Sequence, residues 1–166
     1  MSSEKPDEPE DLERPPSFFS FADLGAEALG SDYSREPVEV TVEQVMSAQT
    51  GQTIQRFVLL SDGERKLPIT IGPFEAASIS QALSQTEPDR PLSHDLIVDI
   101  LEKLDGEVSH IFIDDLFGGT YYAKIVFDRD EERFTVDSRP SDAIAIALRL
   151  GVSIFVAEGI LEQHGH

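Results

Sequence analysis

Residues 134–150 read FTVDSRPSDAIAIALRL, and this stretch decides the fold because a strand runs into a helix at a proline. The pattern predicts a strand over 132–138 and a helix over 140–150. Pro140 fits the first helical position, since its missing N–H has no helical partner there. Gly151 follows the last apolar residue and is expected to end the helix.

A second stretch, LPITIGPFEAASISQAL at 67–83, aligns with the first when the chain is shifted by 67 residues. Pro73 then matches Pro140, and Glu75 falls on Asp142. The predicted hairpins before the two stretches align as well. This repeat predicts an internal duplication of a β-β-β-α unit.

Hydrophobic periodicity and turn residues predict the remaining elements. Ser93 is expected to cap a helix, and the terminal EGILEQHGH is expected to form only a short end segment. The predicted fold class is α+β, with mostly antiparallel strands packed with three helices. The expected strands are 37–48, 54–60, 66–71, 107–115, 119–128, 132–138 and 152–156, and the expected helices are 73–85, 93–104 and 140–150.

The N-terminal part of the chain differs in composition from the rest. Residues 1–36 hold ten acids, three bases and four prolines, which predicts a flexible extension. An apolar island at 18–29 could recruit a protein partner or fold back on its own domain. The predicted organisation is this extension, a folded domain over 37–160, and a C-terminal tail over 161–166.

The whole chain has 13 basic and 32 acidic residues, a net charge of −19, which argues against an ordinary basic nucleic-acid binder. Arginine outnumbers lysine nine to four, a balance that resembles proteins of salt-accumulating halophiles. Cysteine is absent, which excludes disulfides and thiolate chemistry. With neither a secretory signal pattern nor an apolar run long enough to span a membrane, a cytoplasmic protein is expected.

The turn at Arg139 is the first candidate site. A helix N-terminus suits phosphate, and Arg139 could add a bidentate contact. Asp137 and Asp142 could hold a divalent metal, and Glu75 occupies the position equivalent to Asp142 in the repeat. The alternative is that Glu75 and Asp142 only cap their helices.

The stretch RPLSHDL at 90–96 is the second candidate. His94 could act as a general base together with Asp95, and Arg90 could hold a phosphate. The alternative is that His94 and Asp95 fill the first helical turn after a Ser93 cap. The chain has no Walker A or GxGxxG motif, so no nucleotide cofactor is expected.

Taken together, these segments resemble the bifunctional nuclease domain family. The resemblance rests on LPITIGPFEA (67–76), RPLSHDL (90–96), GTYYAKIVF (119–127) and VDSRPSDAIAIALR (136–149). It implies an α+β domain that forms homodimers or other homo-oligomers, and nuclease activity on DNA and RNA. The family's matching positions are Glu75, Arg90, His94, Asp95, Asp137, Arg139, Ser141 and Asp142.

Two classes of function follow. The first is a phosphodiester hydrolase with a divalent metal, Mg²⁺ or Mn²⁺, in which Glu75, Asp137 and Asp142 supply metal ligands. His94 would then act as general base or acid, with Asp95, Arg139 and Asp142 as the other catalytic residues. Arg90, Arg139 and Ser141 would bind substrate, the two arginines by holding the phosphate. The second class is a non-enzymatic, homo-oligomeric binding or regulatory module that uses the same motifs as interfaces.

Overall fold

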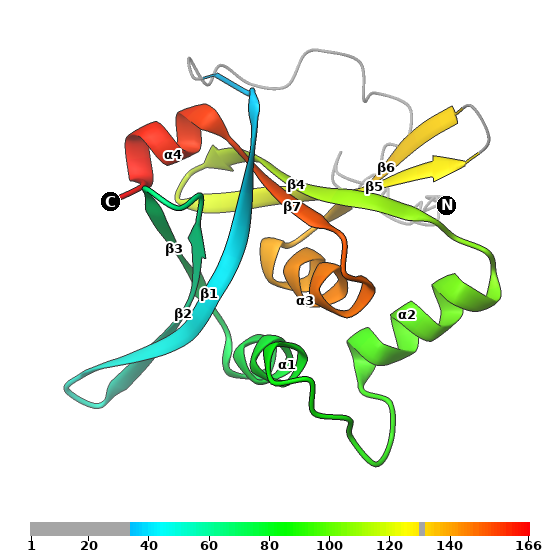
Figure 1. The fold of residues 1–166 in the computed structure, drawn as a ribbon. Helices are drawn as coiled ribbons and strands as arrows, with labels where there is room; N and C mark the ends of the chain where they lie inside the picture. The colour runs from blue at the N-terminus through cyan, green and yellow to red at the C-terminus, as the bar shows by residue number, and fades with distance from the viewer. Residues whose placement is uncertain (1–33, 130–131) are drawn as a thin grey trace, which may run out of the picture. The chain divides into compact units, whose positions relative to one another are not determined.

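The computed structural model describes residues 34–129 and 132–166, which form seven strands and four helices (Figure 1). The first half contains β1 (Pro37–Thr50), β2 (Thr53–Ser61), β3 (Lys66–Ile71), α1 (Pro73–Leu83) and α2 (Ser93–Lys103). The second half contains β4 (Val108–Phe117), β5 (Thr120–Arg129), β6 (Glu132–Ser138), α3 (Pro140–Leu150), β7 (Ser153–Ala157) and α4 (Glu158–His164).

All seven strands belong to one sheet with the order β3-β2-β1-β7-β4-β5-β6. Every neighbouring pair is antiparallel except β4 and β7, which run parallel. The predicted α+β class with mostly antiparallel strands is therefore confirmed. Gly151 ends α3 as expected, with a φ of 68° in the left-handed region that glycine adopts without steric cost.

The predicted helix count of three is wrong by one. The terminal segment forms α4, and most of this helix lies in the predicted tail. Ile160 and Leu161 of α4 are fully buried, and the helix packs against β3 and β7. A helix of seven residues is marginal by itself in water, so tertiary burial rather than local sequence stabilises it.

The two β-β-β-α halves share their pairing register. Leu59 of β2 pairs with Pro68 of β3. The residues 67 positions later, Val126 of β5 and Thr135 of β6, pair with each other in the same way. The two halves flank β7, which lies between β1 and β4. The common order and register agree with the repeat in the sequence, while duplication itself stays a prediction.

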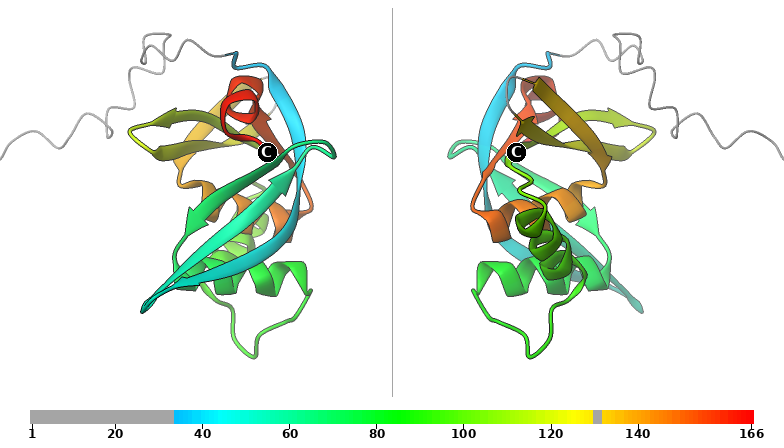
Figure 2. Two further views of the ribbon diagram at one scale, coloured as in Figure 1. Left: turned by 90° about the vertical axis from the view of Figure 1, so that its left-hand side faces the viewer. Right: turned by 90° about the vertical axis from the view of Figure 1, so that its right-hand side faces the viewer.

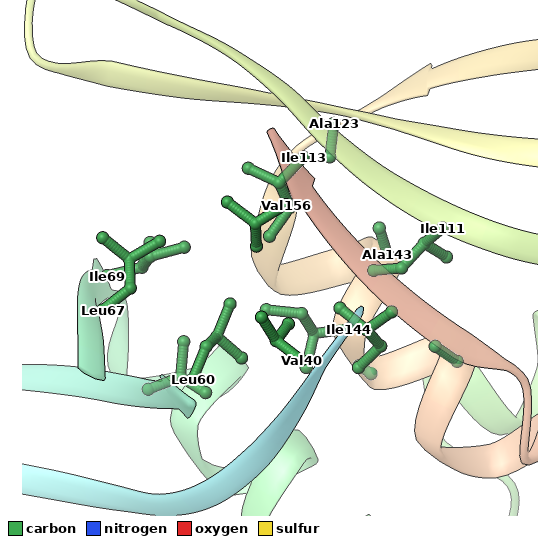
Figure 3. Packing of buried hydrophobic residues seen from close by; sticks show 14 of the residues in the cluster. Val40, Leu60, Leu67, Ile69, Ile111, Ile113, Ala123, Ala143, Ile144 and Val156 are labelled. Atoms are coloured by element: carbon green, nitrogen blue, oxygen red, sulfur yellow. The ribbon is translucent and has the colours of Figure 1, made fainter. Parts of the chain in front are cut away.

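The hydrophobic core lies between the sheet and two helices. Helix α1 packs on β1 and β2, helix α3 packs on β4, β5 and β7, and the two helices pack on each other. Ile144 of α3 is fully buried among side chains from both halves of the sheet (Figure 3). Helices α1 and α2 lie at the end of this domain opposite α4 (Figure 2). The sheet thus holds the start of α3 beside α1.

Residues 18–29 lie outside the described residues, so their interpretation as a docking segment stays a prediction. Within the part of the chain that the structure describes, no helix has the length and apolar character needed to cross a lipid bilayer.

An ion-pair network joins the turn between β2 and β3 to α4. The carboxylate of Asp62 accepts the backbone N–H groups of Glu64 at 2.9 Å and Arg65 at 2.7 Å. The guanidinium of Arg65 donates to Asp62 and also, at 2.8 and 3.0 Å, to both oxygens of Glu158. These hydrogen bonds, the Arg65 backbone bond first among them, lower the pKa of Asp62 from 3.8 to about 2.

Asp62→Asn is expected to reduce the free energy of unfolding at pH 7 by up to about 2 kcal/mol, because the lowered pKa stabilises the ionised folded state. In wild type this contribution is present above pH 3.8 and is lost as the pH falls toward 2. Urea unfolding of both proteins between pH 7 and pH 2 measures it. Asp128→Asn, at an exposed ion pair with Arg133, is the control and should change stability much less. Equal pH profiles for wild type and Asp62→Asn would contradict the assignment.

Candidate active site at two helix ends

The N-termini of α1 and α3 lie side by side because the two helices pack together. Each helix begins with a proline, Pro73 or Pro140, and its third residue is an acid, Glu75 or Asp142. Among the described residues, no hydrogen bond joins the N–H of Gly72 to Glu75 or the N–H of Arg139 to Asp142. The hydrogen-bond partners of these acids are side chains. The interpretation of these two acids as helix caps is therefore wrong, and both carboxylates are available for other contacts.

Arg139 bridges the two carboxylates. Its Nε donates to Oδ2 of Asp142 at 2.7 Å, and Nη2 donates to Oδ1 of the same group at 3.0 Å. Its Nη1 donates to Oε1 of Glu75 at 3.0 Å. The Arg139 side chain remains 66% exposed, whereas those of Glu75 and Asp142 are only 18% and 27% exposed. One cation is thus held at the surface by two largely buried acids that are far apart in sequence.

His94 extends this cluster toward α1 and α2. Its Nε2 lies 3.1 Å from Oδ1 of Asp142, and its Nδ1 lies 2.8 Å from Oγ of Ser78. A carboxylate only accepts hydrogen bonds, so Nε2 carries the hydrogen. In neutral His94 the Nδ1 lone pair then accepts the hydroxyl hydrogen of Ser78. Three helices therefore contribute to one chain of hydrogen bonds from Ser78 to Asp142.

The charges in this cluster stabilise one another. Burial alone would raise the pKa of Asp142, but hydrogen bonds from Arg139 and His94 outweigh it and hold that pKa below its usual value. The hydrogen bonds that Arg139 donates to Asp142, together with the charges of Asp142 and Glu75, raise the pKa of Arg139. Asp142 is therefore ionised at neutral pH, which suits it to orient cations and donors and makes it a poor proton acceptor.

Asp95 has a different environment from the other predicted site residues. One of its carboxylate oxygens accepts the N–H of Leu92 at 2.9 Å, and the other pairs with Nε of Arg149. The hydrogen bond from Arg149 is the largest cause that lowers the pKa of Asp95, and the hydrogen bond from the N–H of Leu92 adds to it. Leu92 is the N-cap residue of α2 and Ser93 is already helical, so the expected Ser93 cap is wrong. Asp95 closes the helix end in its place.

The residues of this cluster line a cleft of about 1020 Å³. The same lining includes an apolar wall, which contains Phe74, a residue that is 86% exposed, and Val136 of β6. The cleft thus combines charged groups with hydrophobic surface, as expected of a ligand-binding site. Its lining residues include Phe74, Glu75, Ser78, Leu92, His94, Ile97, Leu101, Phe127, Val136, Asp137, Arg139 and Asp142.

The structure gathers some of the predicted site residues and separates others. Asp137 is exposed on β6 and lines the cleft. Ser141 lines a second, smaller cavity next to Arg139. Arg90 is exposed in the loop before α2, lines neither cavity and forms no ion pair with the described residues. The structure therefore does not bring Arg90 together with Arg139, the other arginine that was expected to hold the phosphate.

Three residues of this region were not predicted from sequence. Ser78 lies one helical turn after Glu75, so helical spacing from that acid could have identified it. Phe74 precedes Glu75 at the helix start, where an exposed aromatic residue is a signal for binding. Arg149 follows Asp142 by two turns on α3, but its pairing with Asp95 depends on how α2 packs and has no signal in the sequence.

A divalent metal does not fit the side chains as they are arranged. Among residues 34–129 and 132–166, no three His, Asp or Glu side chains group closely enough to hold a metal ion. Glu75 and Asp142 already share a cation, the guanidinium of Arg139. A metal between these two carboxylates would require Arg139 to move away.

Comparison with known proteins assigns the chain to a family. The Bifunctional nuclease domain family matches residues 58–166. The chain belongs to this family. The match begins within β2 and includes α1, α2, α3 and the whole Arg139 cluster, so the residues that form the site are those of the family domain.

Several curated proteins are similar to this chain. An uncharacterized protein of Mycobacterium tuberculosis strain H37Rv is 48% identical over 105 residues, which cover 63% of this chain and 62% of that protein. Bifunctional nuclease 1 of Oryza sativa subsp. japonica is 28% identical over 102 residues, covering 60% of this chain and 31% of the rice protein. The Oryza minuta protein named bifunctional nuclease matches equally. The chain thus spans less than two thirds of the length of these relatives.

Gly72→Ala is expected to displace Glu75 without changing any charge. A Cβ at this position would overlap Oε2 of Glu75 and lie 3.2 Å from its Cδ, so the carboxylate must move. The φ of Gly72 is −76°, which alanine adopts without strain. For the phosphodiester cleavage proposed below, we expect kcat/KM to fall by about 10- to 100-fold, the effect of a small displacement at a reacting centre. Steady-state kinetics beside thermal unfolding measure this, with Glu75→Gln for comparison. Unchanged kinetics in Gly72→Ala would show that the position of Glu75 is unimportant.

Proposed function

We propose that this chain is a nuclease that hydrolyses phosphodiester bonds of DNA, RNA or both in the cleft beside Arg139. Membership of the Bifunctional nuclease domain family and the rice relatives named bifunctional nuclease support the reaction class. The geometry of Arg139 carries the proposal for this site.

Arg139 is prepared to bind a phosphate. A guanidinium has five N–H groups, and three of them are directed at Glu75 and Asp142. The other two remain for a ligand, and the side chain faces solvent at the mouth of the cleft. The two acids fix the orientation of the guanidinium before substrate arrives, so little reorganisation is needed to stabilise charge on the phosphate.

Proton transfer is assigned to His94. The Nδ1 lone pair is the group that can take a proton from an attacking water, while Asp142 holds Nε2–H and orients the ring. In this structure the hydroxyl of Ser78 is hydrogen-bonded to Nδ1. The proton from water therefore either passes through that hydroxyl or reaches Nδ1 after the Ser78 side chain has rotated. Ser78 and Asp142 act on His94 from opposite sides of the ring.

The apolar wall supports a nucleotide rather than a simple phosphate ester as ligand. Phe74 is exposed and precedes Glu75 on α1, and Val136 of β6 lines the same cleft. Bases bind by stacking on aromatic side chains, and this contact tolerates any base. A base on this wall would leave its phosphate near the charged groups of the cleft.

Metal dependence remains part of the proposal as a prediction. Glu75, Asp137 and Asp142 are the carboxylates that line the cleft, and Mg²⁺ or Mn²⁺ prefers such oxygen ligands. The present contacts of Arg139 oppose a metal between Glu75 and Asp142, so no step of the reaction is built on one. Activity in EDTA compared with Mg²⁺ or Mn²⁺ separates a guanidinium-based site from a metal-based site.

The experiment is cleavage of labelled single- and double-stranded DNA and RNA in EDTA, Mg²⁺ and Mn²⁺, from low salt to molar KCl. The salt range matters because the net charge of −19 repels nucleic acid unless it is screened. Wild type is compared with Asp142→Asn/His94→Ala and with Asp99→Asn, an exposed acid on α2 outside the cleft. Cleavage lost only in the double variant supports the proposal. Equal cleavage by all three proteins contradicts this site, and no cleavage under any condition contradicts the function.

A second candidate is the non-enzymatic, homo-oligomeric binding module, and one observation favours it. Helix α2 has no fully buried residue, and an apolar row along it stays exposed at four-residue spacing, comprising Leu92, Leu96, Ile100 and Leu104. We propose that a second copy of the chain covers this row. Light scattering of wild type and Leu96→Glu/Ile100→Glu tests it: a dimer that becomes monomeric supports the interface, and a monomeric wild type contradicts it.

A further inference from the structure

Arg139 separates two cavities. Besides the cleft, a smaller cavity of about 450 Å³ lies where β3, the turn between β4 and β5, and the start of α3 come together. Arg139 and Glu75 line both cavities. The two cavities therefore adjoin at Arg139 and Glu75.

Ser141 brings to this second cavity two donors that have no partner among residues 34–129 and 132–166. The residue is only 7% exposed, and its hydroxyl forms no hydrogen bond with the described residues. The N–H groups of Asp142 and Ala143 reach the carbonyl oxygen of Arg139 at 3.1 Å, but the N–H of Ser141 has no such acceptor in the described part of the chain. The N–H belongs to the first turn of α3, where every helix leaves its N–H groups without a helical partner. Buried hydroxyls are nearly always hydrogen-bonded, so the buried Ser141 hydroxyl is the group that indicates a bound ligand or water.

The other lining groups define what kind of ligand fits. Thr120 and Tyr121 add hydroxyl groups, and burial raises the pKa of Tyr121, which keeps its hydroxyl neutral. Ile69 and Ile71 supply apolar surface. Neutral donors and acceptors beside apolar carbon suit a sugar. Arg139 and Glu75 also line this cavity, but their charges offset one another in an ion pair, so the cavity adds no further cation for a second phosphate.

We propose that the smaller cavity binds the sugar of the nucleotide on the other side of the phosphodiester held by Arg139. The enzyme then contacts one nucleotide on each side of the bond it cleaves, with the base of one on the Phe74 wall and the sugar of the other against Ser141. This inference rests on the proposed nuclease function and adds the extent of substrate that the site recognises.

The test compares two substrates that differ only on one side of the phosphate. One is a dinucleoside monophosphate, and the other is a mononucleoside p-nitrophenyl phosphodiester, used as both its 3′ and 5′ esters. Ser141→Ala is expected to lower kcat/KM about tenfold on the dinucleotide, the usual effect of losing one neutral hydrogen bond. On the ester whose nucleoside occupies the cleft, no sugar reaches Ser141, so the fall in kcat/KM should be at least about fivefold smaller than on the dinucleotide.

Stability measurements keep this result from being read as a folding defect. Because Ser141 has no partner in the described residues, Ser141→Ala should be at least as stable as wild type in urea unfolding. Ser80→Ala, an exposed serine on α1 that lines neither cavity, is the matched control. A large destabilisation of Ser141→Ala alone would assign Ser141 to the structure and overturn the subsite.

The remaining outcomes separate the subsite from the proposed function. If wild type cleaves the dinucleotide and Ser141→Ala loses equal activity on dinucleotide and esters, the nuclease stands and the subsite is overturned. If wild type cleaves nothing, the nuclease function fails and the uncleaved dinucleotide becomes a stable ligand for calorimetry. Tighter binding of the dinucleotide than of the mononucleotide, lost in Ser141→Ala, would support the subsite even then, and equal binding would overturn it.

Discussion

Replacement of Arg139 by lysine is expected to lower kcat/KM for phosphodiester cleavage by about 100- to 1000-fold, the range for losing a preorganised donor to a developing charge. Lysine keeps the charge but has a single ammonium on a flexible stem. It cannot bond both oxygens of Asp142 and Oε1 of Glu75 while also presenting paired donors to a phosphate. The measurement is steady-state cleavage of a labelled oligonucleotide under the condition that is optimal for wild type.

Arg133→Lys is the matched control for Arg139→Lys. Arg133 lies on β6, the strand that leads to Arg139, and it also pairs with an acid, Asp128. It lines neither cavity. Both variants should unfold at nearly the wild-type temperature because both arginines are mostly exposed. Activity within a few-fold of wild type in Arg139→Lys would remove the guanidinium from the mechanism and leave a simple positive charge as the requirement.

Asp95→Ala is expected to destabilise the protein by about 3–5 kcal/mol, the cost of leaving a buried charge without its partner. The side chain of Arg149 is only 9% exposed, and Asp95 supplies its counter-charge. The remaining contacts of Arg149 are to the backbone oxygens of Ala145 at 2.9 Å and Ser78 at 3.4 Å, which do not neutralise it. The variant also loses the hydrogen bond to the N–H of Leu92 at the start of α2. Urea unfolding at neutral pH measures the change.

The double variant Asp95→Ala/Arg149→Met distinguishes a buried ion pair from other roles of Asp95. Methionine fills similar space without a charge, so most of the lost stability should return. Activity is also measured per folded molecule. This control is needed because His94 lies next to Asp95 on the same turn of α2. A double variant as unstable as Asp95→Ala would show that Arg149 was not the partner that mattered. A stable, folded Asp95→Ala without activity would return Asp95 to the catalytic group.

The order of elements follows from local sequence. Proline after a strand, at Pro73 and Pro140, places the start of α1 and α3 correctly because proline loses nothing at the first helical position. Alternating apolar residues and turn dipeptides locate the strands to within a few residues, since these signals act over short distances. The helix α4 was missed because its stability comes from burial of Ile160 and Leu161 against distant strands.

The candidate site could be predicted only as separate residues. Helical position alone allowed Glu75 and Asp142 to be caps or ligands, and local sequence could not decide because both acids occupy the third position of a helix. Arg90 was grouped with His94 by proximity in sequence, yet the loop before α2 leaves it outside both cavities. The roles of such residues depend on what lies opposite them in space.

What the sequence by itself determined is therefore the α+β class, the helix starts, and the residue types available at each start. Only the tertiary structure decided that α1 packs against α3, which brings Glu75 and Asp142 to one guanidinium, that of Arg139. It also decided that His94 joins Asp142 while its neighbour Asp95 pairs with Arg149. The physical reason is that periodicity and turn chemistry act between neighbours in the chain, whereas charge pairing and desolvation depend on distances that exist only after the helices have packed.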